Sequence, residues 1–267
     1  MKIIDVHTHV FPDNLAHKVM GNLQKANAPY KPFTDGTIRG LLASMDEAGI
    51  TSSFILNIAT KPEQIAAIIK WTRSICSDRI ISLGSIHPDS ISWQKDIDDL
   101  RKNGIKGIKF QPMYQKFAID EKRMLPIYEY IAASKMFVIF HSGEDIAFPG
   151  NTQSSVDRIG NILKEVPRLK IIAAHFGGWR SWPAVLEHLC GKDVFLETSF
   201  IHEVDETLRH KIFSSHDRRR FLFGSDSPWG SQKMQVEFIK NLSEIDGSFK
   251  DGVFYENVNF LLNSLNE

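Results

Sequence analysis

The pattern that most constrains the fold of this chain is a series of eight short apolar runs, rich in Ile, Val and Phe, separated by stretches of helical periodicity. We expect strands at residues 2–7, 52–58, 80–86, 105–110, 136–141, 169–175, 193–199 and 220–225. The intervening helices are expected at residues 38–48, 63–75, 92–103, 124–134, 155–166, 182–190 and 204–215. Such alternation indicates right-handed βαβ units and a parallel sheet. Eight units in 267 residues predict a regular or distorted (β/α)8 TIM barrel rather than an open doubly wound sheet.

The organisation of the chain is expected to be simple. Residues 1–267 contain no low-complexity linker, and this length suits one barrel, so we expect a single domain. No Gly-rich phosphate-binding turn follows the first strand, which argues against a dinucleotide-binding fold. Residues 11–33 form an insertion between the first strand and the next helix. We expect this insertion to cover an active site.

The composition narrows the classes of partner. Basic and acidic residues balance at 32 each, which gives no electrostatic signature for nucleic acid or an anionic membrane surface. No apolar run approaches the ~20 residues of a membrane span, and the N-terminus lacks the features of a signal peptide. Cys76 and Cys190 are expected on buried helix faces, without a disulfide, in the reducing cytoplasm. We therefore expect a small-molecule substrate, with a homodimer as the candidate assembly.

The first strand carries the His-x-His motif His7-Thr8-His9. Side chains alternate along a strand, so Asp5, His7 and His9 are expected on one face, with Ile4 and Val6 on the other, under the helices. Two neutral imidazoles at positions i and i+2 can chelate one divalent metal. Taken alone, the motif is equally consistent with ordinary surface or core histidines.

Three further strands end in side chains of ligand type, namely His141, His175 and Asp226. The carboxyl ends of the strands of a parallel barrel lie on one face, where active sites form. A single histidine at such an end can be a satisfied core residue. Four separate strands bring histidine or aspartate side chains to one rim of the barrel, and this pattern predicts a metal site. Three histidines and a carboxylate suit zinc or another divalent metal such as manganese.

With these motifs the chain resembles the amidohydrolase superfamily, in the branch that includes aminocarboxymuconate-semialdehyde decarboxylase. The resemblance covers nearly the full length of the chain. It rests on Asp5-Val6-His7-Thr8-His9, Gly107-Ile108-Lys109-Phe110-Gln111-Pro112, His141-Ser142-Gly143, Ala174-His175-Phe176-Gly177-Gly178, Gly224-Ser225-Asp226-Ser227-Pro228 and a closing helix at 255–262. The motifs of the first and eighth strands are the specific ones.

The resemblance implies a ligand set and separate roles. His7, His9, His141 and Asp226 would ligate one metal, with water at an open position. His175 would stand beside the metal as an acid–base or electrostatic group, or would ligate a second metal as in binuclear relatives. The chemistry agrees, because such a metal lowers the pKa of bound water toward ~7. Asp226 can then accept a proton, and His175 can stabilise charge on the reacting group.

Lys109 has two interpretations. It shares strand parity with Gly107 and is expected to project into the barrel. Some members of the superfamily carry a carbamylated lysine on this strand, which bridges two metals. We favour the alternative, an ion pair within the barrel mouth with Glu197.

Several other residues are weaker candidates. His87 and His202 follow strands and could contact substrate, although exposed loop histidines are the simpler explanation. Three arginines could bind a substrate carboxylate, and nothing local selects among them: Arg39, Arg158 and Arg180.

These features support three functions in descending order. The first is a metal-dependent hydrolase that uses activated water on an amide, ester or lactone-like carbonyl. The second is a metal-dependent non-oxidative decarboxylase of a small unsaturated or aromatic acid, which an arginine clamp facing the metal would favour. The third is a metal-holding binding protein without catalysis. It ranks last, because Asp226 and His175 supply proton-transfer groups that binding alone does not require.

Overall fold

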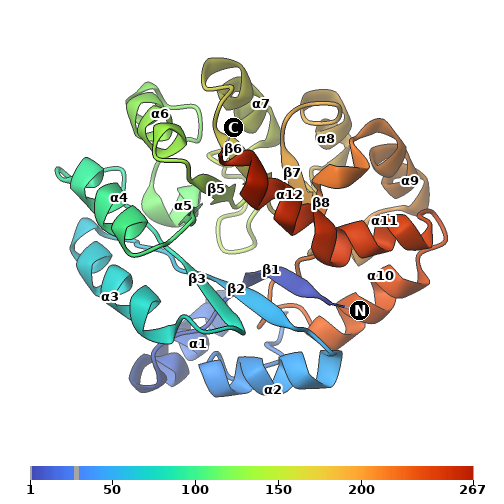
Figure 1. Ribbon diagram of the computed structural model, residues 1–267, viewed down its shortest axis with the longest axis horizontal. Coiled ribbons are helices and arrows are strands. Elements are labelled where there is room, and N and C mark those ends of the chain that lie inside the picture. Colours follow the sequence, from blue (N-terminus) through green and yellow to red (C-terminus); the bar gives the residue numbers. More distant parts are fainter. Residues whose placement is uncertain (1, 27–29, 267) are drawn as a thin grey trace.

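The computed structural model describes residues 2–26 and 30–266, which form the predicted TIM barrel (Figure 1). The described residues contain eight parallel strands: β1 (Ile4–Thr8), β2 (Ser52–Leu56), β3 (Ile80–Leu83), β4 (Gly107–Phe110), β5 (Phe137–Phe140), β6 (Lys170–Ala173), β7 (Phe195–Glu197) and β8 (Phe221–Leu222). Each lies within or overlaps its predicted apolar run. Several predicted apolar runs extend beyond the carboxyl ends of their strands. At these positions the chain leaves the sheet and forms the loops of the site.

The helices surround the strands. Seven match the predicted helices to within a few residues: α2 (Ile38–Ala48), α3 (Ile65–Ile75), α4 (Trp93–Lys102), α6 (Leu125–Ala133), α7 (Val156–Glu165), α8 (Trp182–His188) and α9 (Glu206–Ser215). The others are α1 (Asp13–Ala26), α5 (Pro112–Gln115), α10 (Gln232–Asn241), α11 (Gly247–Asp251) and α12 (Asn257–Ser264), with a π-helical turn at Gly252–Glu256. Thus the insertion after β1 forms a helix, α1. None of the described helices combines the length and apolar character needed to cross a membrane.

The barrel is closed at two irregular seams. Backbone ladders join β1-β2-β3 and β4-β5-β6-β7-β8. Between the two ladders, Gly84 N donates to the carbonyl of Gly107, and Lys109 N donates to the carbonyl of Gly84. At the other seam, Asp226 N donates to the carbonyl of His7. This second seam fixes two predicted site residues to each other through the backbone.

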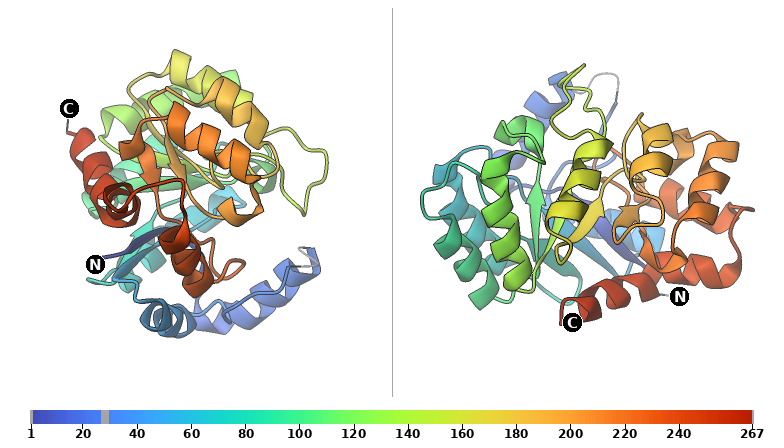
Figure 2. Two further views of the ribbon diagram at one scale, coloured as in Figure 1. Left: turned by 90° about the vertical axis from the view of Figure 1, so that its right-hand side faces the viewer. Right: turned by 90° about the horizontal axis from the view of Figure 1, so that it is seen from above.

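Two apolar layers hold the barrel together. The interior is filled from alternate strand positions by side chains such as Phe54, Ile139 and Leu222, together with residues of α12. Gly107 lies on this inner side, where an added Cβ would lie 2.4 Å from ring atoms of Phe137, so only glycine leaves room for that ring. The second layer lies between the strands and the surrounding helices. Figure 2 shows α12 at the end of the barrel opposite α1, so the site opens at the α1 end.

The strict alternation expected for β1 is wrong. Ile4 and Val6 belong to the interior layer, not to the layer under the helices. The register between β1 and β2 shifts between Asp5 and Thr8, and this irregularity changes which side chains face inward. His7 therefore reaches the barrel mouth although Val6 also packs inside.

Asp5 consequently does not share the face of His7 and His9. It is fully buried and accepts hydrogen bonds from the hydroxyl of Ser225 (2.5 Å) and from Gln232 Nε2 of α10 (2.8 Å). Ser225 N also donates to Asp5 at 3.0 Å. Burial raises the pKa of Asp5 to about 7, while these donors act in the opposite direction. Asp5 thus holds the segment that carries Asp226 against β1.

The two cysteines differ from their predicted surroundings. Cys76 is exposed and Cys190 is half-buried, and both thiols are free. Their expected places on buried helix faces are wrong, because Cys76 directly follows the last residue of α3 and Cys190 lies beyond the end of α8.

Candidate metal centre and substrate cavity

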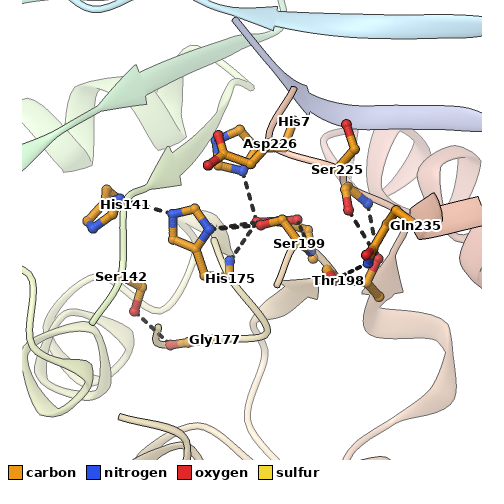
Figure 3. Close-up of polar contacts among 12 residues, drawn as sticks. His7, His141, Ser142, His175, Gly177, Thr198, Ser199, Ser225, Asp226 and Gln235 are labelled. Carbon is orange, nitrogen blue, oxygen red and sulfur yellow. Dashed lines mark hydrogen bonds and ion pairs between the residues drawn. The ribbon is translucent and has the colours of Figure 1, made fainter. Parts of the chain in front are cut away.

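Five side chains predicted from the sequence meet at the carboxyl end of the barrel. Figure 3 labels His7, His141, His175 and Asp226 among them. His7 lies in β1 and His9 directly beyond it, while the others follow β5, β6 and β8, namely His141, His175 and Asp226. His7 Nε2 lies 3.2 Å from His9 Nε2 and 3.2 Å from Asp226 Oδ1. His9 Nε2 lies 3.3 Å from the same carboxylate oxygen. His7, His175 and Asp226 offer ligand atoms that all lie within 4.8 Å of one another.

Hydrogen bonds fix the tautomers of the first-strand histidines. His9 Nδ1 donates to the carbonyl of Leu56 at 2.9 Å, and His7 Nδ1 donates to Glu197 Oε1 at 2.9 Å. In a neutral imidazole with Nδ1 protonated, Nε2 keeps its lone pair. Burial lowers the pKa of His7 well below its ordinary value, and the charge of Lys109 adds to this effect. The lone pairs of His7 Nε2 and His9 Nε2 and the Asp226 carboxylate oxygen therefore lie close together without a proton between them.

The same holds for the second pair of histidines. Ser199 Oγ donates to Glu197 Oε1 at 2.7 Å and accepts from His175 Nδ1 at 2.8 Å, which leaves a lone pair on His175 Nε2. His141 Nε2 donates to the carbonyl of Glu144 at 2.9 Å, which leaves a lone pair on its Nδ1. These two lone pairs face each other at 3.0 Å. Burial lowers the pKa of both rings, that of His175 well below its ordinary value.

We call these five atoms the acceptor cluster: His7 Nε2, His9 Nε2, His141 Nδ1, His175 Nε2 and Asp226 Oδ1. Electron-rich atoms at such separations repel one another unless a cation lies among them. A tetrahedral zinc shell with bonds of about 2.0–2.1 Å has ligand–ligand separations of about 3.3 Å. The separations of 3.2–3.3 Å among His7, His9 and Asp226 therefore fit one face of such a shell. Nitrogen and carboxylate donors also suit zinc or manganese by their chemistry.

Glu197, at the end of β7, orients the cluster and was predicted only as a partner of Lys109. Besides His7 Nδ1 and the Ser199 hydroxyl, it accepts from His175 N (2.5 Å) and Ser199 N (2.8 Å). Burial raises the pKa of this carboxyl, and the hydrogen bonds from His175 and Ser199 act in the opposite direction. An added Cβ at Gly224 would lie 2.0 Å from Glu197 Oε2, so glycine is needed there for the carboxylate to fit.

The backbone at two cluster residues is strained. His175 has φ of 60° and Asp226 has φ of 57°, in the left-handed region that non-glycine residues rarely adopt. Such conformations cost of order 1–3 kcal/mol each and persist where the surroundings determine them. Here the hydrogen bonds from His175 N to Glu197 and from Asp226 N to the carbonyl of His7 impose them. The positions of these two side chains therefore lower the stability of the fold.

Lys109 projects into the barrel mouth as predicted and lines the cavity. Its expected ion pair with Glu197 is wrong, because within residues 2–26 and 30–266 no carboxylate oxygen pairs with Lys109 at 4.0 Å or less. The oxygens of Glu197 already accept four other donors. Burial lowers the pKa of Lys109 to about 8, and the more distant charges of Asp226 and Glu197 oppose this shift. Lys109 is thus a buried cation directed at the cavity.

A cavity of about 530 Å³ adjoins the acceptor cluster, a volume typical of small-molecule sites. The insertion after β1 contributes to its wall, as predicted, through α1 and Tyr30. Tyr30 OH donates to Glu203 Oε1 at 2.8 Å, and Trp179 Nε1 donates to Glu203 Oε2 at 3.2 Å. Glu203 thereby joins the insertion to the loops that follow β6 and β7.

The structure adds polar wall residues that were not predicted. Gln111, next to the Gly-Ile-Lys motif, donates through Nε2 to Asp145 Oδ2 at 2.6 Å. Tyr114 also lines the cavity, and burial raises its pKa to about 12, with the charge of Asp145 contributing. The position of Gln111 beside β4 was the available sequence signal. Asp145 lies in a long loop that carries no such signal.

The weaker candidates lie outside the cavity wall that the described residues form. His87 is buried, contrary to the exposed loop position expected, and its Nδ1 accepts from Asp89 N at 3.1 Å. His202 is exposed, as expected. Arg158 pairs with Asp120, and Arg180 stacks on the ring of Trp179 at 4.2 Å. Arg39 is likewise absent from the wall of the cavity, so none of the three candidate arginines faces the cluster.

Comparison with known proteins identifies the family. The family model described as amidohydrolase matches residues 4–257, so the chain belongs to the amidohydrolase family. It is therefore an enzyme, and the non-catalytic interpretation is set aside. No curated protein sequence matches the chain significantly.

Solved structures share the fold at low sequence identity. A 5-carboxyvanillate decarboxylase from Novosphingobium aromaticivorans, complexed with manganese and 4-hydroxy-3-methoxy-5-nitrobenzoic acid, is 14% identical, with a TM-score of 0.75 over 98% of this chain and 96% of that one. A 2,6-dihydroxybenzoate decarboxylase is 13% identical (TM-score 0.74, 98% and 99% covered). A putative 2-pyrone-4,6-dicarboxylic acid hydrolase from Pseudomonas putida is 16% identical (TM-score 0.67, 98% and 97% covered). At these identities the likeness establishes the barrel fold.

Proposed function

We propose that this enzyme is a metal-dependent hydrolase that acts on an amide, ester or lactone-like carbonyl of a small molecule. The observation that carries the proposal is the acceptor cluster, whose lone pairs converge at one end of a mainly apolar cavity. A neutral carbonyl compound suits this cavity, because apolar walls favour uncharged ligands while a few polar groups fix their orientation.

In this proposal His7, His9, His141 and Asp226 would hold one divalent metal, zinc or manganese. When bound, it would polarise the substrate carbonyl and lower the pKa of water toward ~7. Glu197 supports the arrangement by holding the Nδ1 proton of His7, which keeps Nε2 available as a ligand. The carbonyl of Leu56 does the same for His9.

The remaining groups move protons and stabilise charge. Asp226 accepts the proton of the attacking water, since its carboxylate already lies among the ligand atoms. His175 serves the substrate side, where its Nε2 lone pair takes up the proton from Asp226 and passes it to the leaving group. The Ser199 hydroxyl fixes its ring, and Glu197 completes this chain of hydrogen bonds. Lys109 offers a cationic donor to the negative charge that develops on the carbonyl oxygen.

Lys109 also supports a second candidate function, non-oxidative decarboxylation of an unsaturated or aromatic acid. A buried lysine directed at the cavity can pair with a substrate carboxylate. The candidate arginines cannot serve here, because Arg39, Arg158 and Arg180 lie outside the cavity wall. The apolar lining makes the neutral substrate the better fit, and hydrolysis is therefore the preferred proposal.

Activity measurements with defined metal content test this choice. Protein loaded with zinc or with manganese is assayed on panels of esters, lactones, amides and aromatic carboxylates. We expect hydrolysis of members of the first three panels at neutral pH, loss of activity on chelation and recovery when the metal is restored. Release of CO2 from the carboxylates without any hydrolysis would instead establish the decarboxylase. Full activity of metal-stripped protein would contradict both.

A further inference from the structure

One wall of the cavity is an apolar helix face that the catalytic proposal does not use. Leu15, Val19 and Leu23 of α1 all line the cavity, at positions i, i+4 and i+8 on one side of the helix. With a rise of 1.5 Å per residue, this stripe extends for about 12 Å. Leu15 retains 46% of its surface exposed, which places this end of the stripe at solvent. The wall is therefore an elongated apolar surface.

A second part of the cavity wall is built from α3. Ile68 and Trp71, about one turn apart, line the same cavity and are only half-buried. Ile58, in the loop between β2 and α3, also lines it. We call the surface formed by these three residues and by Leu15, Val19 and Leu23 the apolar track. Half-buried side chains on both walls leave apolar area that a ligand can cover.

Most of the polar groups that line the cavity lie away from this track. Thr60 and Gln64 beside α3 are exceptions, and the Thr60 hydroxyl donates to Gln64 Oε1 at 3.1 Å. The acceptor cluster and Lys109 lie at the carboxyl ends of strands, whereas the track is carried by α1, α3 and the loop before α3. A ligand that fills the cavity thus meets most of the polar groups at the strand ends and mainly apolar side chains along α1 and α3. This division predicts a ligand with one polar reactive group and one elongated apolar group.

We propose that the substrate carries an elongated alkyl or acyl chain, which lies in the apolar track while its carbonyl lies at the acceptor cluster. The placement of the carbonyl rests on the proposed function, whereas the placement of the chain rests on the track alone. Burial of each methylene contributes about fourfold in affinity, so affinity should rise steeply with chain length until the track is filled.

Two binding series test the chain and the carbonyl separately. In the first, primary alcohols from ethanol to decanol displace the neutral fluorophore N-phenyl-1-naphthylamine from metal-free protein. In the second, straight-chain hydroxamates from acetohydroxamate to decanohydroxamate bind to zinc-loaded protein in a calorimeter. We expect affinity to rise by about fourfold per methylene over several members of both series.

A pair of variants on α1 locates the effect. Val19→Glu places a charge in the track, whereas Lys18→Glu places the same charge on an exposed neighbour outside the cavity wall. Val19→Glu should reduce the affinity for decanohydroxamate by at least about tenfold and leave acetohydroxamate unchanged, because only the long chain reaches α1. Lys18→Glu should retain the full dependence on chain length. Circular dichroism of both variants verifies that α1 and the barrel remain folded.

Each result decides between the two proposals. Affinity that does not change with chain length in either series overturns the apolar track. The apolar track is also overturned if Val19→Glu and Lys18→Glu weaken the dependence of affinity on chain length to the same extent. Length-dependent binding of the alcohols without any binding of hydroxamates supports the track, and it contradicts the metal site of the proposed function instead.

Discussion

Replacement of Asp226 by asparagine is expected to lower turnover by about 10³–10⁴-fold and to weaken metal retention. Asparagine preserves the shape of the side chain but removes its negative charge and its basicity. The new amide can also donate a hydrogen bond to the lone pair of His7 or His9, which lie 3.2 and 3.3 Å from Asp226 Oδ1. In the variant, this hydrogen bond occupies a histidine lone pair that would otherwise bind the cation. Metal content and turnover are measured on the same samples.

The control for this variant is Asp89→Asn, which removes a negative charge from an exposed loop residue on the same rim of the barrel. It should retain metal and turnover. If Asp226→Asn keeps full metal content and full activity, Asp226 is neither the ligand nor the proton acceptor, and the proposed roles of this residue fail.

Replacement of His175 by asparagine is expected to lower turnover by roughly 10²–10⁴-fold while one metal remains bound. The reason is that His7, His9, His141 and Asp226 already supply a complete ligand set in the proposal. His175 is held by the Ser199 hydroxyl and contacts His141 Nδ1 at 3.0 Å, so it is placed to act on the substrate beside the metal. The measurements are again metal content and turnover on the same samples.

His216→Asn is the matched control, because it removes another buried histidine, whose ring contacts Gly191 N and the carbonyl of Val194 outside the cavity wall. It should lower stability by about 1 kcal/mol and leave the metal and turnover in place. Loss of the metal in His175→Asn would make His175 a ligand and overturn the assignment to the substrate side. Unchanged metal and unchanged turnover would reduce His175 to a core histidine.

The barrel and the meeting of the five cluster residues could be predicted from the sequence, because both follow from local patterns and one rule of topology. Apolar runs ending in His141, His175 or Asp226 mark strand ends, and parallel strands bring these ends to one rim. The insertion after β1 was also predicted as part of the site. Its leucine and valine stripe at i, i+4 and i+8 was present in the sequence and would have predicted both α1 and the apolar track.

Other features depend on contacts that no local pattern encodes. The register shift in β1 turns Asp5 away from His7, whereas strict alternation placed them on one face. Lys109 and Glu197 project into the same barrel mouth, yet Glu197 is committed to His7, His175 and Ser199 rather than to the lysine. Their separation is set by the packing of the four strands β4 to β7, which a sequence pattern does not specify.

The central claim is that one divalent metal is bound by His7, His9, His141 and Asp226. Anomalous diffraction from crystals of protein purified without chelator, recorded on both sides of the zinc and manganese absorption edges, tests it most directly. The account predicts one peak per chain, at about 2.0–2.3 Å from His7 Nε2, His9 Nε2, His141 Nδ1 and Asp226 Oδ1, and an unmodified Lys109. Two peaks bridged by a carbamylated Lys109, or metal-free crystals of fully active protein, would contradict it.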